Sequence, residues 1–394
     1  MPPLAPRKMI TIQHRSQNFM FCMLITMLGV IANVLNTVVD RIALSYDQQA
    51  MMAGLYISVY ATGSLTSVTL SSALADVIGK RTVIAVALLF MILGILLLAL
   101  SQSFALALVS LFFIGFGFGP SEAMSSALLN DDNPLQASRW MNISQAGFSL
   151  GSILAPILTM AYLSLGRSYR QVFLICGFIF VLIFIRILQT SKGSIMWPKS
   201  NISIPLHMFT VLKSGRIRLY ALMIFCYLGY ESVAPPYIKQ LFLQTGQREN
   251  LAAFMISLFW ISMIVSRLIG TLLANREMPA IKVFTSFVIM GFLLMVFARS
   301  MAVRIVGVIL LGFGCGPVWP MLLVLAVREF PQRSGSAIGV MMIFSTAGIS
   351  IFPFLIGTLA NSLTITFSLC VVLGLLVFVT AFKAGRLNYE KSSS

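Results

Sequence analysis

The chain has 394 residues, of which 58% are hydrophobic and only 10% are charged, and its formal net charge is +16 at pH 7. A soluble protein of this length needs far more charged residues on its surface, so the composition excludes a soluble globular domain and indicates that apolar side chains face lipid. The five cysteines all fall within hydrophobic runs and have no metal-ligand spacing. This argues against a disulfide framework, a metal site or a cofactor.

Twelve hydrophobic runs follow one another along the chain, separated by short polar breaks. Each is about 20 residues long, enough for a helix to cross a bilayer, and the backbone polar groups of a segment in hydrocarbon must be paired within it. The runs lack the alternation that barrel strands need. In chain order, the expected transmembrane helices cover residues 17–39, 50–72, 81–101, 104–130, 138–163, 169–188, 217–240, 250–273, 280–298, 301–327, 334–358 and 362–385. Pro235 and Pro236 are expected to interrupt the seventh helix, because proline cannot continue a regular helix.

The second half of the chain repeats the first. The string GFGFGP at 115–120 returns as GFGCGP at 312–317, and the same offset of 197 residues brings Pro134 onto Pro331. A duplication with parallel halves is one of the known architectures of transporters. We therefore predict an all-α membrane protein with twelve transmembrane helices in two pseudo-symmetric six-helix bundles. The expected parts are an N-terminal bundle (1–188), a cytoplasmic linker (189–216) and a C-terminal bundle (217–394).

The basic residues indicate how the chain is oriented. Most of the 27 Lys and Arg residues fall on the breaks that share a side of the membrane with the N-terminus, which is the asymmetry of the positive-inside rule. Both termini are therefore expected in the cytoplasm, and a bacterial inner membrane is the expected location. The same distribution accounts for the net charge without a nucleic-acid partner.

A polar segment follows the second run and reads SALADVIGKRTVI at 72–84. It resembles the signature G-x-L-A-D-x-x-G-[RK]-[KR]-x-x-[IL] of the major facilitator superfamily, with Ser72 at the first glycine. The resemblance implies a gate, in which a carboxylate at a helix end bonds backbone N–H groups and basic neighbours. The alternative is that Asp76 only caps a helix. The predicted gate comprises four positions of this motif and one arginine from each of two repeated segments: Asp76, Gly79, Lys80, Arg81, Arg139 and Arg333.

Few ionisable residues lie inside the hydrophobic runs and away from their ends: Glu122, Glu231 and Arg267, with Asp40 near the outer end of the first run. Such groups are costly in a membrane, so each is a candidate functional residue. An isolated carboxyl group at the depth of Glu122 is expected to keep its proton, because its charged form is poorly solvated. A group that exchanges its proton as water reaches it from alternate sides is what proton coupling needs, and we assign this role to Glu122, Asp40 and Glu231. The alternative is a permanently neutral acid that donates a hydrogen bond.

Polar and aromatic residues recur at helical spacing in several runs. In the first run, Asn33, Asn36 and Thr37 lie three and four residues apart on one face. An unpaired amide in hydrocarbon is costly, so such faces predict a hydrated central cavity. Amides, tyrosines and a carboxyl group suit a neutral polyhydroxylated solute, with an aromatic ring against its apolar face. The predicted substrate-binding residues are Asn33, Asn36, Thr37, Tyr60, Glu122, Asn142, Gln145, Tyr227, Tyr230, Glu231, Arg267 and Trp319.

Several short motifs resemble the fucose permease-like branch of the same superfamily. They are G-x-G-x-x-x-x-E ending at Glu122, NVLNT at 33–37, NISQAGF at 142–148, YLGYE at 227–231, SRLIG at 266–270 and GPVWP at 316–320. The resemblance implies sugar:proton symport at a site that both halves line. The residues it implies are Asn33, Asn36, Glu122, Asn142 and Gln145 in the first half, with Glu231, Arg267 and Trp319 as their counterparts in the second. The aspartate of that family's first helix falls on Thr37 here, and Asp40 lies one turn further outward.

The sequence therefore predicts a secondary transporter that moves a small, polar, sugar-like solute by proton-coupled alternating access, as a symporter. One alternative is proton-coupled efflux of drugs or metabolites by antiport, and another is a non-transporting membrane protein such as a receptor. No grouping of a nucleophile with a base is apparent, so an enzyme is not expected. The expected partners are the solute, protons and membrane lipid, with the chain acting as a monomer.

Overall fold

The computed structural model describes residues 12–46, 53–190, 207–359 and 362–393. The first half contains α1 (Ile12–Leu44), α2 (Ala53–Ile78), α3 (Lys80–Leu100), α4 (Phe104–Asp131), α5 (Ala137–Ser164) and α6 (Tyr169–Thr190). The second half contains α7 (His207–Leu212), α8 (Gly215–Gln244), α9 (Glu249–Gly270), α10 (Glu277–Phe297), α11 (Met301–Cys315), α12 (Val318–Glu329), the 3-10 helix η2 (Pro331–Arg333), α13 (Ser334–Leu359) and α14 (Leu363–Ser393). No β-strand occurs within these described ranges.

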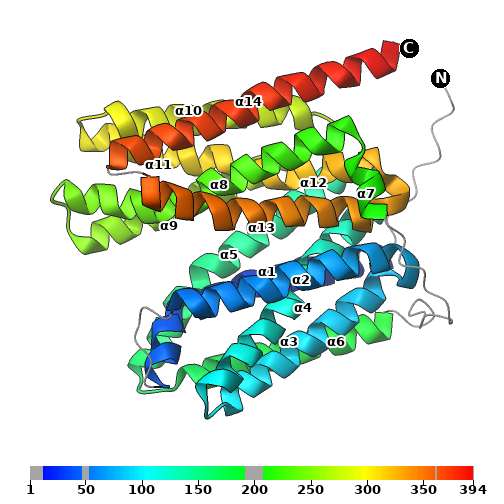
Figure 1. The fold of residues 1–394 in the computed structure, drawn as a ribbon, viewed down its shortest axis with the longest axis vertical. Helices are drawn as coiled ribbons and strands as arrows, with labels where there is room; N and C mark the ends of the chain where they lie inside the picture. The colour runs from blue at the N-terminus through cyan, green and yellow to red at the C-terminus, as the bar shows by residue number, and fades with distance from the viewer. Residues whose placement is uncertain (1–11, 47–52, 191–206, 360–361, 394) are drawn as a thin grey trace.

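The helices form two bundles, which lie one above the other in Figure 1. The lower bundle consists of α1 to α6 and the upper one of α8 to α14, with the short α7 leading into α8. Among the described residues, ten helical segments are long and apolar enough to cross a membrane, and α9 contributes a shorter apolar segment, Phe254–Gly270. α2, with 26 residues, is long enough to cross a membrane but is not among these segments. α11 and α12 together form one of these spans.

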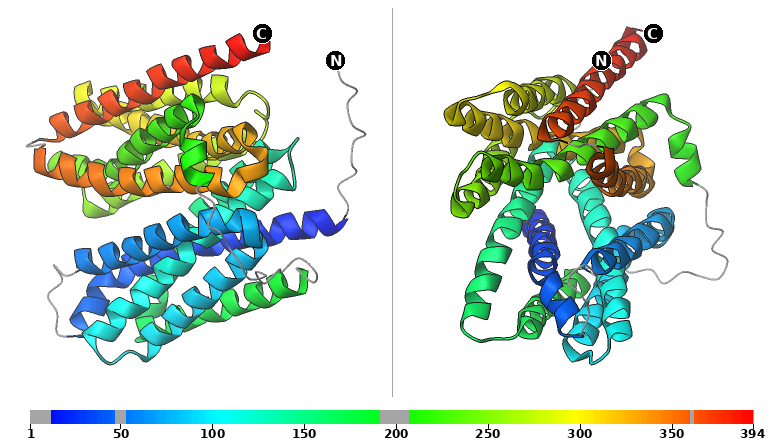
Figure 2. Two further views of the ribbon diagram at one scale, coloured as in Figure 1. Left: turned by 45° about the vertical axis from the view of Figure 1, so that its right-hand side comes forward. Right: turned by 60° about the vertical axis from the view of Figure 1, so that its left-hand side comes forward.

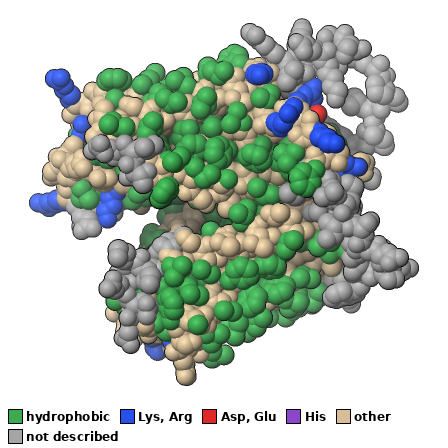
Figure 3. Space-filling model, in the orientation of Figure 1, with side chains coloured by type: hydrophobic (Ala, Val, Ile, Leu, Met, Phe, Trp, Pro, Cys, Tyr) green, Lys and Arg blue, Asp and Glu red, His purple; other side chains and the backbone are tan. Residues whose placement is uncertain are grey.

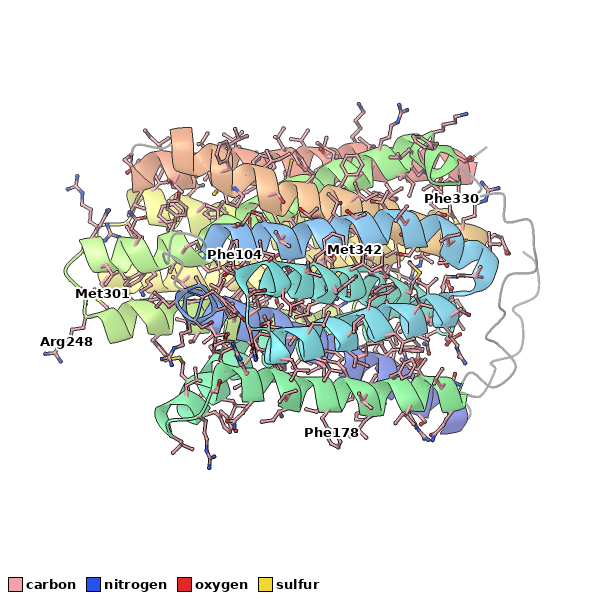
Figure 4. The ribbon with its side chains drawn as sticks, turned by 60° about the horizontal axis from the view of Figure 1, so that its bottom comes forward. Phe104, Phe178, Arg248, Met301, Phe330 and Met342 are labelled. Carbon is pink, nitrogen blue, oxygen red and sulfur yellow. The ribbon has the colours of Figure 1, made fainter. Side chains whose placement is uncertain are left out.

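Both ends of the described chain lie on one side of the molecule (Figure 2), because an even number of spans returns the chain to the side where it began. We call this the terminal side, where α1 begins and α14 ends, and the opposite side the distal side. The distal side carries the turns between α8 and α9 and between α10 and α11. Phe104 and Met301, which begin α4 and α11, both lie on the distal side in Figure 4. These two positions are 197 residues apart, as the repeat requires.

Apolar side chains cover the outer faces of both bundles (Figure 3). In α3 and α6 these include Leu89, Leu93, Leu96 and Phe178, all exposed, and Phe178 points away from the bundle in Figure 4. Soluble proteins rarely expose continuous apolar surface of this extent. These faces are therefore the lipid-facing surface of an integral membrane protein.

The two bundles meet mainly where α2 packs on α13 and where α5 packs on α9. Figure 3 shows a recess between the bundles that opens at the distal side. On the terminal side, Asp131 at the end of α4 accepts a hydrogen bond from the hydroxyl of Ser334 at the start of α13 (2.9 Å). The molecule is thus open on the distal side and joined across the bundles on the terminal side.

The repeated glycines have the same packing role in both halves. A Cβ atom on Gly115 of α4 would collide with the backbone oxygen of Tyr60 in α2. Likewise, a Cβ atom on Gly312 of α11 would collide with the backbone oxygen of Phe259 in α9. Small residues allow such close approach of transmembrane helices. The equivalence seen in the sequence is therefore present in the packing.

Two expectations about helix continuity are wrong. The tenth span, expected as one helix over 301–327, is broken at Gly316 and Pro317 into α11 and α12, since Pro317 and Pro320 each offer no N–H to the preceding turn. Conversely, Pro235 and Pro236 lie inside α8, which continues through them. In a membrane bundle, neighbouring helices and small local adjustments can satisfy the backbone groups that a proline frees.

The expected linker, 189–216, is only partly described. It includes α7 and the first residues of α8, whereas residues 191–206 lie outside the described ranges. The bounds of the three expected parts therefore stay a prediction.

Candidate functional site

Arg267 lies in the contact between the two bundles. Its side chain, on α9, is only 3% exposed. Nε donates a hydrogen bond to the backbone oxygen of Gly316 (3.0 Å), and Nη1 donates to the backbone oxygen of Gln145 (2.6 Å) and to the hydroxyl of Ser149. Gly316 belongs to the C-terminal bundle, while Gln145 and Ser149 belong to α5 of the N-terminal bundle. A buried cation therefore connects the two.

The break between α11 and α12 provides one of these acceptors. In a continuous helix the oxygen of Gly316 would accept a hydrogen bond from residue 320, but Pro320 has no N–H. Arg267 supplies the missing donor. The hydroxyl of Tyr227 donates to the oxygen of Cys315 at the same break (3.0 Å). Discontinuous transmembrane helices present backbone groups to central binding sites in this way.

Two carboxyl groups lie close enough to Arg267 to interact with its charge: Glu122 of α4 and Glu231 of α8. Glu122 lies beside the amide of Gln145, and Glu231 lies beside the hydroxyl of Tyr227. Both glutamates are partly exposed, which fits groups that face an internal space rather than packed core. The structure thus brings together the three ionisable residues that the sequence places within the transmembrane runs.

Several polar atoms around this cluster are buried without a hydrogen-bond partner. Among the predicted substrate-binding residues, these atoms are Oη of Tyr60, Oδ1 of Asn142, Nε2 of Gln145 and Oη of Tyr230. Buried polar atoms in folded proteins are nearly always hydrogen-bonded. Each of these atoms is therefore a group that a solute or a water molecule is expected to satisfy.

The predicted α1 residues differ in how their side chains are satisfied. Nδ2 of Asn33 donates to the backbone of its own helix at Gly29 (3.0 Å), and the hydroxyl of Thr37 donates to the oxygen of Asn33 (2.6 Å). Asn36 is exposed, whereas Asn33 and Thr37 are partly exposed. The side chain of Asp40 lies outside the described ones. These residues therefore offer a polar face with at least one freely accessible amide.

Trp319 takes the position in the second half that Glu122 has in the first. It is the second residue of α12, directly after the break, and its side chain is 7% exposed. Its neighbours Val318 and Met321 are fully buried. The counterpart of the carboxyl group is therefore a large aromatic ring held among apolar side chains.

The two main contacts between the bundles each place a glycine against a polar side chain. A Cβ atom on Gly270 of α9 would lie 2.6 Å from Oδ1 of Asn142 in α5, and one on Gly339 of α13 would collide with Oγ of Ser72 in α2. Asn142 and Gly339 are 197 residues apart and occupy equivalent positions in the repeat. In the α5–α9 contact the polar side chain is on α5 and the glycine on α9. In the equivalent α13–α2 contact the glycine is on α13 and the polar side chain on α2.

On the terminal side, the predicted gate motif forms an ion-pair network. Gly79 joins α2 to α3 with φ 89°, a left-handed conformation that favours glycine. Nζ of Lys80 lies 2.9 Å from Oδ2 of Asp131. The same carboxylate oxygen accepts the hydrogen bond from Ser334 of the other bundle. The motif therefore contributes to the link between the bundles through Asp131, a residue that the sequence analysis did not assign.

The other predicted gate residues take part to different extents. Arg81 contributes a longer ion pair with Asp132 (3.9 Å). Arg139 is exposed and Arg333 partly exposed, and neither side chain takes part in a hydrogen bond or ion pair found among the described residues. The side chain of Asp76 lies outside the described ones. The structure therefore brings Lys80 and Arg81 into the network but not Arg139 or Arg333.

The second half contains the equivalent ion pair with its charges exchanged. Arg328 donates through Nη1 to Oε2 of Glu277 (2.8 Å) and through Nη2 to Oε1 (2.9 Å), and Glu277 is 2% exposed. Glu277 lies 197 residues after Lys80, and Arg328 lies 197 residues after Asp131. Neither residue of this pair is among the predicted gate residues. Applying the repeat offset to charged residues as well as to glycines and prolines would have found it.

The sequence matches a known family and is similar to the sequences of two known proteins. A family model described as Major Facilitator Superfamily matches residues 19–353. The TsgA homolog of Buchnera aphidicola subsp. Baizongia pistaciae (strain Bp) is 23% identical over 73% of each chain. The glucose/mannose transporter GlcP of Bacillus subtilis (strain 168) is 20% identical over 77% of this chain and 78% of its own.

Solved structures have the same fold. The transporter FucP in the outward conformation matches with a TM-score of 0.77 at 18% identity, over 93% of this chain and 98% of its own. The human organic anion transporter MFSD10 (TETRAN) matches with a TM-score of 0.74 at 18% identity, over 94% of this chain and 100% of its own. These matches confirm the predicted twelve-helix fold class, and the likeness to FucP agrees with the branch that the sequence motifs indicate.

Proposed function

The chain belongs to the Major Facilitator Superfamily, and on that premise we propose that it is a symporter that imports a small, neutral, sugar-like solute together with protons. Membership makes the chain an integral multi-pass membrane transporter rather than an enzyme. We propose that the terminal side lies in the cytoplasm, which the distribution of basic residues supports, so that the recess would open to the outside. We further propose a bacterial inner membrane as its location and a monomer as its functional form.

The observation that carries the proposal is the group of unpartnered polar atoms around Arg267 and the two glutamates, contributed by Tyr60, Asn142, Gln145 and Tyr230. This group combines donors and acceptors, and each hydroxyl of a sugar can both donate and accept. A neutral solute also fits the charge balance, because Arg267 already donates to protein acceptors in both bundles. An anionic solute would have to compete with these acceptors for the guanidinium of Arg267.

We assign different contacts to the two faces of the solute. The polar face of α1, with the exposed Asn36, would meet a solute that enters the recess, and Nε2 of Gln145 would bind it more deeply. Trp319 and Tyr230 would lie against its apolar face, where rings provide contact area without competing for hydroxyls. The remaining residues proposed for the site are Asn33, Thr37, Tyr60, Glu122, Asn142, Tyr227, Glu231 and Arg267.

Glu122 is the group to which we assign proton coupling, with Asp40 and Glu231 as further candidates. Its carboxyl group lies beside the amide of Gln145 and within the electrostatic reach of Arg267. A change in its protonation would therefore alter the charge next to the proposed solute contacts. Rocking of the two bundles about this midplane site would expose Glu122 to each side in turn.

The relatives are consistent with this class of solute. GlcP is a glucose/mannose transporter and FucP is a fucose:proton symporter, whereas MFSD10 is an organic anion transporter. The fold alone therefore leaves the solute open, and the polar site is what favours a sugar. Proton-coupled efflux of drugs or metabolites by antiport is the alternative that a test must separate from it.

Ligand-induced thermal stabilisation of the purified protein provides this test. The panel contains hexoses, deoxyhexoses, polyols, organic acids and cationic drugs, each at several concentrations. We expect a sugar or polyol to raise Tm in a saturable manner, and the same compound to accumulate in proteoliposomes under an inward proton gradient. Stabilisation by cationic drugs or organic acids alone would favour the efflux alternative.

A further inference from the structure

Arg267 uses its charge in an unusual way for a residue inside a membrane span. Intramembrane ionisable groups generally pair with an opposite charge, but the hydrogen bonds of Arg267 go to two backbone oxygens and a hydroxyl. One of the two backbone acceptors lies in each bundle. The guanidinium therefore donates its hydrogen bonds to neutral acceptors, at the place where α5 packs on α9.

This contact is one of the two main ones that join the bundles. Around Arg267 the helices lie close together, with Gly270 against Asn142 and the hydroxyl of Ser149 4.0 Å from the sulfur of Met263. Among the described residues, the carboxyl groups in reach of Arg267 are those of Glu122 and Glu231, which do not take part in these hydrogen bonds. Among the described residues at this contact, Arg267 is thus the charged link between α5 and α9.

Separation of α5 from α9 would remove two of the three acceptors and leave the guanidinium buried with only Gly316. An uncompensated buried charge is strongly unfavourable, so the guanidinium needs another acceptor in the opened state. Glu231 lies on α8, which packs on α9 within the same bundle, and a carboxylate is a stronger acceptor for arginine than a carbonyl. The charge can therefore remain within the C-terminal bundle when the N-terminal bundle moves away.

We propose that Arg267 is a latch that holds α5 against α9 and keeps the terminal side closed, and that it transfers to Glu231 when the terminal side opens. This inference rests on the proposed alternating access but does not depend on which solute is carried. It gives Arg267 a positioning role, in which the guanidinium stabilises one state of the carrier. It also explains why the broken helix matters, since Pro320 leaves the oxygen of Gly316 free to hold Nε in place.

Distances between spin labels test the latch without any solute. One pair of labels, at Leu135→Cys and Leu272→Cys, spans the terminal side between the bundles at positions 75% and 83% exposed. A second pair, at Leu165→Cys and Phe297→Cys, spans the distal side at positions that are both 75% exposed. The five native cysteines are buried, so the labels attach to the introduced ones.

Arg267→Met is expected to shift the terminal pair toward longer distances and the distal pair toward shorter ones, with a change of about tenfold in the ratio of the two populations. This estimate corresponds to the loss of about one charge-assisted hydrogen bond in net terms. Arg304→Met is the matched control. Nε of Arg304 also donates to a backbone oxygen, that of Ala298 (3.0 Å), but within one bundle. It is expected to leave both distance distributions unchanged.

Two further variants keep the test decisive if Arg267→Met does not fold. Arg267→Lys keeps the charge but cannot donate from two nitrogens, and Ser149→Ala removes one acceptor from α5, so each should produce a smaller shift in the same direction. Distributions that match wild type in every folded variant would overturn the latch and leave Arg267 as a structural residue. If no sugar in the thermal-stabilisation panel binds, this result would count against the proposed solute and not against the latch, because the label distances are measured without solute.

Discussion

In α4 and in the α11–α12 pair, the two copies of the GFGxGP segment pack alike but continue differently. Gly115 and Gly312 each bring their helix against the backbone of a neighbour, in α2 and α9 respectively. α4 then runs through Pro120 without interruption, whereas the second copy breaks at Gly316 and Pro317. The first proline is thus accommodated within a helix, and its equivalent marks the end of one.

The difference follows from the residue three positions after each proline. In α4 this residue is Ala123, which has an N–H for the oxygen of Gly119, but in the second copy it is Pro320, which has none. The second proline leaves another carbonyl without a helical donor, and side chains from α8 and α9 bind the oxygens at the break. The duplication therefore preserves the packing of the helices, while the residues that follow the shared proline differ, with Trp319 in place of Glu122 and Pro320 in place of Ala123.

The largest expected effect is that of Glu122→Gln, which tests whether the carboxyl group of the first copy does the coupling. The amide keeps the shape and hydrogen-bonding capacity but cannot release a proton. We expect proton-driven accumulation in proteoliposomes to be lost, by at least about tenfold, while the solute still raises Tm. Accumulation equal to that of wild type under the same gradient would rule out this role.

The exchanged ion pairs provide the second comparison. Arg328→Gln removes the partner of the buried Glu277, and we expect it to destabilise the protein by about 2–3 kcal/mol, discounted because Arg328 is about one-third exposed. Lys80→Gln removes the equivalent pair with Asp131, which is more accessible, and about 0.5–1 kcal/mol is expected. Thermal unfolding in detergent measures both. An equal loss in the two variants would contradict the difference in burial.

The contact between Gly339 and Ser72 can be disrupted by one substitution and restored by a second. Gly339→Ala would drive a methyl group into Ser72, at about 1–3 kcal/mol, and should lengthen the distance between labels on the terminal side. Adding Ser72→Gly should restore the wild-type distance, because it removes the colliding hydroxyl. Gly215→Ala is the control, since a Cβ atom there has nothing within 4 Å. A Gly339→Ala protein that matches this control would show that the contact is looser than described.

The smallest expected effect concerns the break itself. Pro320→Ala restores an N–H that can bind the oxygen of Gly316, so it competes with Nε of Arg267 for that acceptor. We expect a decrease in transport of a few-fold, corresponding to roughly 1 kcal/mol for one exchanged hydrogen bond. Pro120→Ala in α4 should have less effect, because that helix is already continuous. Initial uptake rates in proteoliposomes measure both, and a larger loss for Pro120→Ala would contradict the comparison.

Much of the architecture could be predicted from the sequence. Hydrophobic runs of transmembrane length indicated the spans because lipid requires backbone groups to be paired within each helix, and the offset of 197 residues indicated the duplication. The cost of charge in a membrane identified Glu122, Glu231 and Arg267 as the residues to examine. Their grouping around one contact could not be predicted, because it depends on how helices distant in the sequence face one another.

Other features could not be predicted from the sequence because they depend on tertiary contacts. The hydropathy of the tenth run does not distinguish a broken helix from a continuous one, and prolines gave opposite outcomes in α8 and at Pro317. The effect of a proline in a membrane helix depends on which neighbouring group reaches the freed carbonyl. Asp131 was missed for a similar reason, since its role depends on Lys80 and on Ser334 of the other bundle.

The sequence by itself determined the membrane environment, the number of spans, the repeat and the identity of the few intramembrane charges. Each of these follows from composition and spacing, because transfer of side chains and backbone into lipid is governed by local properties of the chain. The tertiary structure decided which acceptors Arg267 binds, which polar atoms remain without partners and which side of the molecule is joined across the bundles. These depend on distances between residues more than 100 positions apart, such as Arg267 and Gln145, and only packing sets such distances.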